Sequence, residues 1–231
     1  MPPFRNSEPR GQLVRMGQTR GYVLYEEIDK ILPAGTREAA AELDTILSEL
    51  VVNSVEVMDE PRTEDSLPHP NAFDEEEFQN PNLPSIKHYI REFARIPRLT
   101  VEAEKELAKQ VREARAGVSA GEVNTARLYA TDGTGKPYNL LGVVMPSENP
   151  AMQKGEQAAD RLIKANLWIA LATATHYTNR GLGLLELVQE GNIGLLLAAR
   201  EYNYHRQYRF STYATWWVRR AIVRAVEDFS K

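Results

Sequence analysis

The sequence contains no cysteine, and this absence excludes disulfide bonds and thiolate metal sites. Its four histidines, His69, His88, His176 and His205, show no metal-ligand spacing, so surface or core roles are expected for them. No stretch approaches the roughly 20 apolar residues that a membrane-spanning helix needs, and no apolar N-terminal segment resembles a signal peptide. We therefore expect a cytoplasmic protein with no membrane partner, no metal and no other cofactor.

Motifs of catalysis are missing as well. The Gly-Thr-Gly-Lys string at 133–136 lacks the full pattern of a phosphate-binding loop and does not follow a clear strand. The sequence pattern contains no evident pair of nucleophile and general base. The sequence therefore indicates a protein that is not an enzyme.

The net charge of −4 is distributed unevenly along the 231 residues. Residues 1–77 hold 7 basic and 17 acidic side chains, whereas residues 78–231 hold 21 basic and 15 acidic ones. The stretch from Arg200 to the end has 7 basic and 3 acidic residues and two of the three tryptophans. This pattern indicates a surface that binds a polyanion and an acidic segment that competes for it. The alternative is a charge that drifts along a solvated chain without function.

Helical periodicity of apolar residues dominates the chain and predicts an all-α fold. A small N-terminal module is expected over residues 1–59, with a polar and mobile start up to about residue 21. Within it, helices are predicted at 22–32 and 37–50, and 55–57 alternates like an extended segment. Residues 60–83 are rich in proline and acidic side chains and poor in large apolar ones, which indicates a disordered linker.

The rest of the chain is predicted to hold more helices on either side of an irregular segment. Residues 84–117 are expected to form a helical region, with one helix from Ser85 and a second one capped by Thr100. Residues 118–153 contain several glycines and prolines and indicate an irregular connector. Residues 154–231 are expected to form a helical bundle. Its helices are predicted at 157–177, 184–200 and 212–227, with a turn at 178–181.

Aromatic residues and arginines are concentrated near the end of the chain. Seven aromatic residues occur within 16 positions, where the chain average of 8% predicts about one. The aromatic members are Tyr202, Tyr204, Tyr208, Phe210, Tyr213, Trp216 and Trp217, and the arginines among them are Arg206, Arg209, Arg219, Arg220 and Arg224.

This composition suits the capture of unpaired DNA bases. Flat side chains stack on single strands with roughly 1 to 3 kcal/mol per base, and arginines neutralise the backbone. Opening a duplex costs on the order of 1.4 kcal/mol per base-pair step, so two or three captured bases would offset a short melted stretch. The alternative is the aromatic core of a helical bundle, although arginine is rarely fully buried. On the last helix the expected inward stripe is Val218, Ala221, Ile222 and Ala225, with Trp216, Arg220, Val223 and Arg224 on the adjoining face.

The predicted helix at 184–200 contains two glycines, Gly191 and Gly194. Each costs about 0.5 to 1 kcal/mol relative to alanine in a helix, so each needs a structural reason. The close approach of another helix would supply that reason. The polar edge that would contact a partner protein consists of Glu186, Gln189, Glu190 and Asn192. A bundle helix with close internal packing and no partner is the alternative.

Two strings in this region, LVQEGNIGL at 187–195 and FSTYATWW at 210–217, closely resemble domain two of primary-type bacterial sigma factors. They stand in the order and spacing of that family. Upstream, residues 85–111 resemble the region that contacts DNA just downstream of the minus-ten hexamer. Residues 21–33 and the acidic helices after them resemble the N-terminal autoinhibitory module. The resemblance covers about four-fifths of the chain.

The resemblance implies two partners, core RNA polymerase and promoter DNA, especially its non-template single strand. The residues that would dock on the clamp helices of the largest polymerase subunit are Glu186, Leu187, Val188, Gln189, Glu190 and Asn192. The acidic head would occupy the DNA channel of the polymerase until promoter DNA displaces it.

The same resemblance implies a role in DNA binding for individual residues. The pocket for the flipped adenine of the minus-ten hexamer would consist of Tyr202, Arg206, Thr212, Tyr213 and Trp216. Trp216 and Trp217 would wedge against the last paired base. Asn166 and Ser211 would help to hold the second flipped base, and Arg219 and Arg224 would contact phosphates. The expected DNA-binding set is completed by Tyr208, Phe210, Arg220 and Val223.

The sequence departs from the family at positions that bear on DNA recognition. Arg220 and Val223 replace a usual glutamine and threonine, the pair associated with the first base of the hexamer. Arginine prefers guanine edges and valine forms no hydrogen bond, so recognition at that base is expected to be altered or lost. Basic residues that are usual in the family are replaced at Trp168, Thr175, His176 and Leu197, which predicts a weaker electrostatic grip on DNA.

We predict from these patterns a bacterial sigma factor that binds core RNA polymerase and directs initiation by recognising and melting the minus-ten element. The sequence ends at Lys231, before the domains that would recognise the extended minus-ten and minus-thirty-five sequences. One alternative is a truncated module that binds polymerase without supporting initiation. Another is that these 231 residues are a piece of a longer chain.

Overall fold

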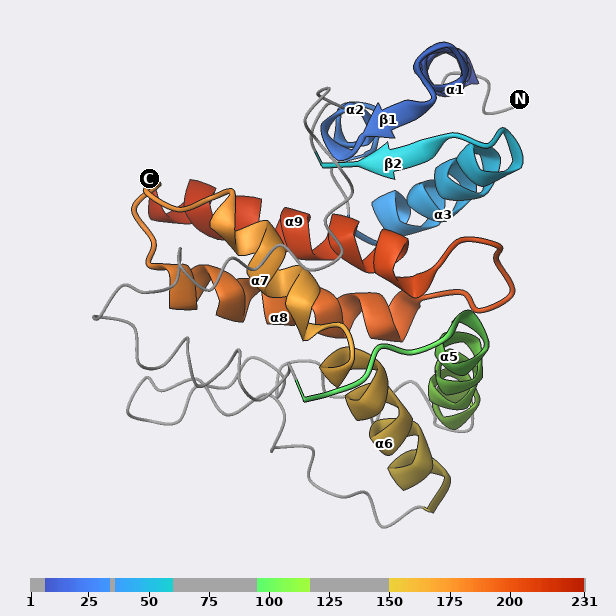
Figure 1. The fold of residues 1–231 in the computed structure, drawn as a ribbon, viewed down its shortest axis with the longest axis vertical. Helices are drawn as coiled ribbons and strands as arrows, with labels where there is room; N and C mark the ends of the chain where they lie inside the picture. Colours follow the sequence, from blue (N-terminus) through green and yellow to red (C-terminus); the bar gives the residue numbers. More distant parts are fainter. Residues whose placement is uncertain (1–6, 34–35, 60–94, 117–149, 231) are drawn as a thin grey trace. The chain divides into compact units, whose positions relative to one another are not determined.

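The computed structural model describes residues 7–33, 36–59, 95–116 and 150–230 (Figure 1). In this part of the chain the regular structure is helical except for one sheet of two short strands, which confirms the predicted all-α fold. None of the described helices combines the length and the apolar character that crossing a membrane requires.

Three predictions lie wholly or largely outside the described residues. They concern the linker at 60–83, the helix expected from Ser85 and the connector at 118–153. The chain divides into two compact units, which are described separately below. One comprises residues 1–89 with 206–208, and the other comprises residues 90–205 with 209–231.

The first unit combines helices with the small sheet. Its elements are α1 (Ser7–Arg20), β1 (Tyr22–Leu24), α2 (Tyr25–Asp29), α3 (Thr36–Val52) and β2 (Glu56–Met58). The strands pair in parallel, with Tyr22 opposite Glu56 and Leu24 opposite Met58. α3 and β2 confirm the predicted helix at 37–50 and the predicted extended segment at 55–57. The core residues without exposed area are Val23, Ile28, Ala39, Leu43, Ile46, Leu47 and Leu50.

The start of the first unit was predicted wrongly as a mobile segment. Residues 7–20 form α1 instead, although their composition is polar. Leu13 on this helix is buried, and Gly17 lets the helix approach the sheet closely. A Cβ atom at Gly17 would come within 2.5 Å of Val55 and 2.7 Å of Val23. The helix is therefore stabilised by packing on a surface that its own periodicity does not indicate.

The helix predicted at 22–32 was also wrong in its first part. Residues 22–24 form β1, and only 25–29 are helical, as α2. The backbone N–H and C=O groups of β1 form hydrogen bonds with β2. These bonds replace the ones that the same groups would form within a helix. A contact between strands that are 34 residues apart along the chain is not visible in local periodicity.

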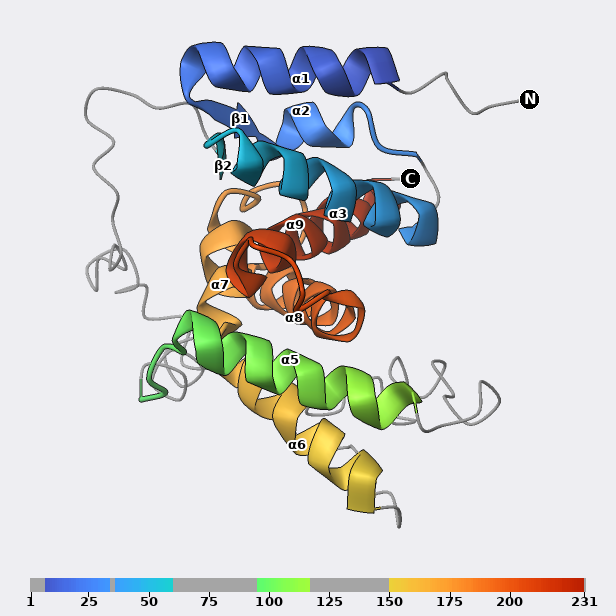
Figure 2. The same cartoon turned by 90° about the vertical axis from the view of Figure 1, so that its right-hand side faces the viewer.

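The second unit is a helical bundle. Its elements are α5 (Val101–Ala116), α6 (Pro150–Lys164), α7 (Leu167–Thr175), α8 (Leu184–Glu201) and α9 (Phe210–Phe229). α5 packs against α6, and α7, α8 and α9 pack on one another, with the most extensive contact between α8 and α9 (Figure 2). Thr100 caps α5 as predicted, because its Oγ1 accepts a hydrogen bond of 3.2 Å from the N–H of Ala103. The predicted turn at 178–181 is confirmed by positive φ angles at Asn179 and Gly181.

The single helix predicted at 157–177 is wrong, because the chain breaks at Asn166 into α6 and α7. The Asn166 side chain donates through Nδ2 to the carbonyl of Leu162 at 2.8 Å. This is the carbonyl that the backbone N–H of Asn166 would use in a continuous α-helix, and that N–H instead bonds to Ile163 at 2.9 Å. A side chain that competes for a backbone acceptor thus ends α6.

The two glycines of α8 confirm the close helix approach that was predicted for them. A Cβ atom at Gly194 would lie 2.5 Å from the carbonyl oxygen of Trp217 and 2.7 Å from the Cα of Val218. At Gly191 a Cβ would lie 3.0 Å from the Cβ of Ala170. α8 therefore touches the backbone of α9 at Gly194 and packs more loosely on α7 at Gly191.

Substitution Gly194→Ala is expected to lower the free energy of unfolding of the second unit by about 1 to 3 kcal/mol, because backbone atoms of α9 must move. Gly191→Ala is expected to cost less, since its neighbours are side-chain atoms and one Cα. The measurement is denaturant unfolding followed by tryptophan fluorescence, because all three tryptophans lie in the second unit. Gly11→Ala on α1 is the control, since nothing lies within 4 Å of its Cβ position. Equal effects at Gly194 and Gly11 would contradict the contact.

Glu27 connects α1 to the start of α2 in the first unit. Its carboxylate accepts hydrogen bonds from Nη2 of Arg20 at 2.7 Å and from the N–H of Leu24 at 2.9 Å. Burial opposes ionisation, but these hydrogen bonds outweigh it and hold the pKa of Glu27 below its ordinary value of 4.5. A carboxyl with a lowered pKa stabilises the fold above its unfolded pKa, and this contribution disappears as the pH falls through the folded pKa.

We expect Glu27→Gln to accelerate amide exchange in β1 and α2 near neutral pH and to reduce its dependence on pH below about 5. The change removes the charge that Arg20 and Leu24 bind, while it preserves the shape of the side chain. Hydrogen exchange measured at a series of pH values gives the result for this unit alone. Glu26→Gln, an exposed neighbour on the same helix, serves as the matched control. Identical pH profiles for wild type and Glu27→Gln would be inconsistent with the lowered pKa.

Candidate nucleic-acid and partner interface

Five aromatic rings contact one another where α8 ends and α9 begins. We call them the aromatic cluster, and they are Tyr202, Phe210, Tyr213, Trp216 and Trp217. Tyr202 ends α8, and the other four lie on the first two turns of α9. The ring centroids are 5.3 Å apart for Tyr202–Phe210, 5.8 Å for Tyr202–Tyr213, 6.2 Å for Tyr213–Trp217 and 5.2 Å for Trp216–Trp217. Three of these four pairs meet edge to face, an arrangement that aromatic rings favour.

All five rings of the aromatic cluster are buried, and Trp216 has no exposed area. Tyr208 is buried as well, whereas Tyr204 is half-buried with its ring 4.0 Å from that of His205. The arrangement in this conformation is thus that of an aromatic core, the alternative that the sequence left open. Within the aromatic cluster, the buried Nε1 of Trp217 has no hydrogen-bond partner among the described residues.

The arginines between these rings have different environments. Arg219 is buried, with its guanidinium 5.9 Å from the ring centre of Tyr177. Arg220 lies over Trp216 at 5.0 Å, and Arg224 is exposed over 79% of its side chain, near Asp228 at 3.9 Å. Arg206 is half-buried. Of the two arginines expected to contact phosphates, Arg224 is accessible and Arg219 is not.

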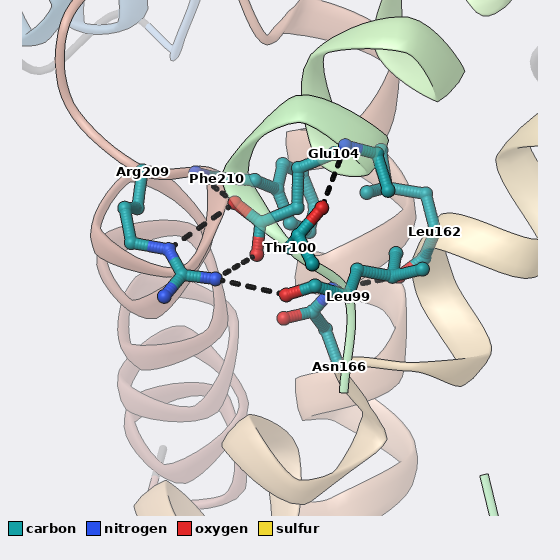
Figure 3. Close-up of polar contacts among 8 residues, drawn as sticks. Leu99, Thr100, Glu104, Leu162, Asn166, Arg209 and Phe210 are labelled. Carbon is teal, nitrogen blue, oxygen red and sulfur yellow. Dashed lines mark hydrogen bonds and ion pairs between the residues drawn. The ribbon is translucent and has the colours of Figure 1, made fainter. Parts of the chain in front are cut away.

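The remaining residues expected to bind DNA lie around the start of α9 and the break before α7. Ser211, Thr212 and Val223 are half-buried on α9. Asn166 is buried, and its amide already binds the carbonyl of Leu162. Figure 3 shows the hydrogen bond between Asn166 and Leu162 and also the one that the Leu99 carbonyl accepts from Arg209 at 3.2 Å.

Glu104 is a buried acidic residue for which the sequence suggested no role. Its carboxylate, 3% exposed, lies between α5 and the first residues of α9 (Figure 3). It accepts hydrogen bonds from Nη2 of Arg209 at 2.7 Å and from the N–H of Phe210 at 3.3 Å. The hydrogen bonds that Arg209 donates to Glu104 raise the pKa of Arg209, with a further contribution from the negative charge of the carboxylate, although burial opposes this rise. No local pattern in the sequence indicated a partner 105 residues away.

The predicted polymerase-binding residues on α8 fall into two groups. Leu187 and Val188 are buried, so they belong to the bundle core in this conformation. The outward edge of α8 consists of Glu186, Gln189, Glu190 and Asn192. Glu186 also closes the start of α8, because its carboxylate accepts a hydrogen bond of 2.8 Å from the N–H of Gly183. Burial raises the pKa of Glu190, and the charge of Arg224 partly offsets this effect.

The described residues contain no group of three or more histidine or acidic side chains that could hold a metal ion. The candidate interface consists of aromatic rings, arginines and amides at one end of the α8–α9 pair, and of a polar edge along α8. The first set is the type of surface that stacks on bases, and the second is the type that contacts a protein.

Three models of one protein family match successive parts of the chain. Residues 7–81 match Sigma-70 factor, region 1.1, residues 85–115 match Sigma-70 factor, region 1.2, and residues 162–230 match Sigma-70 region 2. The outward edge of α8 and the aromatic cluster both lie within the region 2 match. The order of the three matches is the order along the chain that the resemblance predicted.

Individual proteins with similar sequences agree with these matches. The chain is 33% identical over 147 residues to the RNA polymerase sigma factor SigA of Nostoc sp. and to SigA1 of Synechococcus elongatus. It is 38% identical over 143 residues to the RNA polymerase principal sigma factor HrdD of Streptomyces griseus. The matches cover 64%, 64% and 62% of this chain, but only 38%, 37% and 40% of the relatives. The chain thus spans about two fifths of the length of these relatives, and by its three consecutive matched regions it belongs to the sigma-70 family of RNA polymerase sigma factors.

Proposed function

We propose that this protein acts in transcription initiation by binding core RNA polymerase and holding the unpaired non-template strand of the minus-ten element. The observation that carries the proposal is the aromatic cluster, in which five rings gather at the start of α9 within the region 2 match. Arg220 and Arg224 on the same helix add positive charge beside the rings. This combination fits a single strand better than a duplex, because only unpaired bases offer both faces for stacking.

Base capture on this surface requires the rings to be uncovered first. Trp216 is fully buried, and the Nε1 of Trp217 is buried without an acceptor. A buried donor that lacks a partner costs roughly 1 to 3 kcal/mol, so a rearrangement that exposes Trp217 recovers part of its own cost. We propose that rings of the aromatic cluster turn outward as bases arrive, so that contacts between rings are exchanged for stacking on DNA.

Recognition of the first base of the hexamer is proposed to differ from the family pattern. Arg220 stands where glutamine is usual, and its guanidinium lies over the ring of Trp216. Val223, one turn further along α9, is half-buried and cannot donate or accept a hydrogen bond through its side chain. An arginine at this place favours the O6 and N7 acceptors of guanine.

The outward edge of α8 is the proposed docking site for the clamp helices of the largest polymerase subunit. Gln189 and Asn192 offer amides, and Glu190 offers a carboxyl that the bundle already partly desolvates. A partly buried carboxyl loses less hydration when a partner covers it, provided that the partner supplies a donor or a positive charge. A basic or amide-rich helix would meet that requirement.

The first unit is proposed to compete with DNA for the polymerase channel. Residues 1–77 hold 17 acidic and 7 basic side chains, so this part of the chain repels nucleic acid and is attracted to a basic channel. Promoter DNA, with its higher charge density, would displace it. This mechanism assigns a function to the uneven charge along the chain.

Base capture can be measured as the fluorescence of 2-aminopurine in a minus-ten single strand bound to reconstituted holoenzyme. Tyr213→Ala and Trp216→Ala are each expected to weaken strand binding by about tenfold or more, because one stacking partner is lost. Ile222→Ala is the matched control, since Ile222 is also fully buried on α9 but has no ring. Ile222→Ala is expected to lower the stability of the protein without weakening its binding to the strand. If Tyr213→Ala and Trp216→Ala bind the strand as tightly as Ile222→Ala, base capture by these rings is refuted.

Docking on polymerase can be measured as the affinity of labelled protein for core enzyme. The double substitution Gln189→Ala and Glu190→Ala is expected to lower this affinity at least about tenfold, because it removes two adjacent polar contacts of the edge. Glu186 is left unchanged because it also caps α8. Glu201→Ala, an exposed glutamate at the far end of the same helix, is the control. An unchanged affinity of the double variant would exclude this edge as the docking site.

A second candidate function is a module that binds polymerase without supporting initiation. The burial of the aromatic cluster and of Arg219 favours it, since the DNA surface is closed in this conformation. Run-off transcription with the reconstituted holoenzyme separates the two functions. Tight binding to core enzyme without a transcript would support the module, and a transcript of the expected length would support the initiation factor.

A further inference from the structure

The start of α9 is held by a carboxylate from another helix. Glu104 on α5 accepts three hydrogen bonds from this point of the chain, two from the guanidinium of Arg209 and one from the backbone N–H of Phe210. Figure 3 shows the carboxylate between the two residues, with one oxygen facing both the Phe210 N–H and the Arg209 Nε. Although Glu104 is buried, both of its oxygens therefore have partners.

This contact replaces the local cap that most helices have. A helix begins with N–H groups that lack partners inside the helix, and a serine, threonine, aspartate or asparagine before the first turn usually binds one of them. In α9 that position is Arg209, which makes no side-chain hydrogen bond to the backbone of the helix. The carboxylate of Glu104 takes over this function, and its negative charge also matches the positive end of the helix dipole.

Arg209 ties the same point to the beginning of α5. Its Nη2 donates both to Glu104 at 2.7 Å and to the carbonyl of Leu99 at 3.2 Å. Leu99 immediately precedes Thr100, which caps α5. The first turns of two helices are thus joined through one guanidinium and one carboxylate, although half of the Arg209 side chain is exposed.

We infer that Glu104 is a positioning residue for base capture: it sets where α9 begins and thereby where Ser211, Thr212 and Tyr213 lie. This inference rests on the proposed function, because its consequence is measured on the bound strand. Glu104 itself is buried and fully engaged, so it does not contact the bases. It acts through the backbone of Phe210 and through Arg209, within one turn of the aromatic cluster.

Glu104→Gln is the sharpest variant, because it keeps the size of the side chain and removes its charge. The remaining carbonyl oxygen can still accept from Phe210, but it no longer attracts the guanidinium. Strand affinity of the holoenzyme is expected to fall on the order of tenfold, while affinity for core enzyme stays unchanged. Glu106→Gln, which removes the same charge from an exposed site on α5, should change neither affinity.

A substitution of Arg209 tests whether Glu104 influences strand binding through its ion pair with Arg209. Arg209→Gln should weaken strand binding in the same direction, and adding it to Glu104→Gln should produce less than the combined effect of the two single changes. Additive effects would show that the two residues act independently, and they would overturn this part of the inference. Thermal unfolding followed by tryptophan fluorescence confirms that each variant is folded at the temperature of the binding measurement.

Hydrogen exchange of the full chain decides the inference even if no strand binds. Amides of residues 210–213 are expected to exchange faster in Glu104→Gln than in wild type, whereas the amides of α8 should stay protected. Unchanged exchange at 210–213, or equal strand affinity of wild type and Glu104→Gln, would overturn the positioning function. A wild-type holoenzyme that binds no strand would refute base capture instead, and the exchange data would still show whether Glu104 holds the start of α9.

Discussion

The second unit depends on the contact between α8 and α9 at Gly194. Because glycine has no side chain, α8 meets the backbone of α9 directly at Trp217 and Val218. This close approach brings the end of α8, at Tyr202, against the first turns of α9, where Phe210 and Tyr213 complete the contact. The polar residues of α8 that do not face α9 remain at the surface. One pair of helices therefore supplies both the proposed strand-binding surface and the proposed docking edge.

Buried charge imposes a second constraint on the same region. Glu104 would be destabilising in the bundle without partners, because an unpaired carboxylate loses its hydration there. Arg209 and the start of α9 supply those partners, and in return α9 needs no cap of its own. The aromatic cluster thus begins at a point that is fixed by hydrogen bonds, while three of its four ring pairs meet edge to face. This combination suits a surface whose backbone is held in place and whose side chains can rearrange.

The sequence pattern predicted a helix correctly where the residues that define the helix lie within it or directly before it. Thr100 marked the start of α5, and the spacing of Leu43, Ile46, Leu47 and Leu50 marked α3. Gly191 and Gly194 indicated a close neighbour without naming it. Local pattern failed where the boundary depends on a distant partner. Residues 22–24 form a strand because β2 lies beside them. α6 ends because the Asn166 side chain, and not its backbone N–H, forms the hydrogen bond to the carbonyl of Leu162.

The sequence by itself determined the helical class, the family and the residues of the candidate surfaces, because those follow from periodicity and from two specific strings. Only the tertiary structure decided which of these residues are covered. The arginines between the aromatic residues indicated an exposed surface, yet Arg209 is directed at a carboxylate on α5 and Arg219 at the ring of Tyr177. Arg209 forms an ion pair with Glu104 of another helix, and Arg219 lies near a ring in the turn after α7, so the rings between these arginines can pack as a core. Such partners lie far away in the sequence, and no local spacing specifies them.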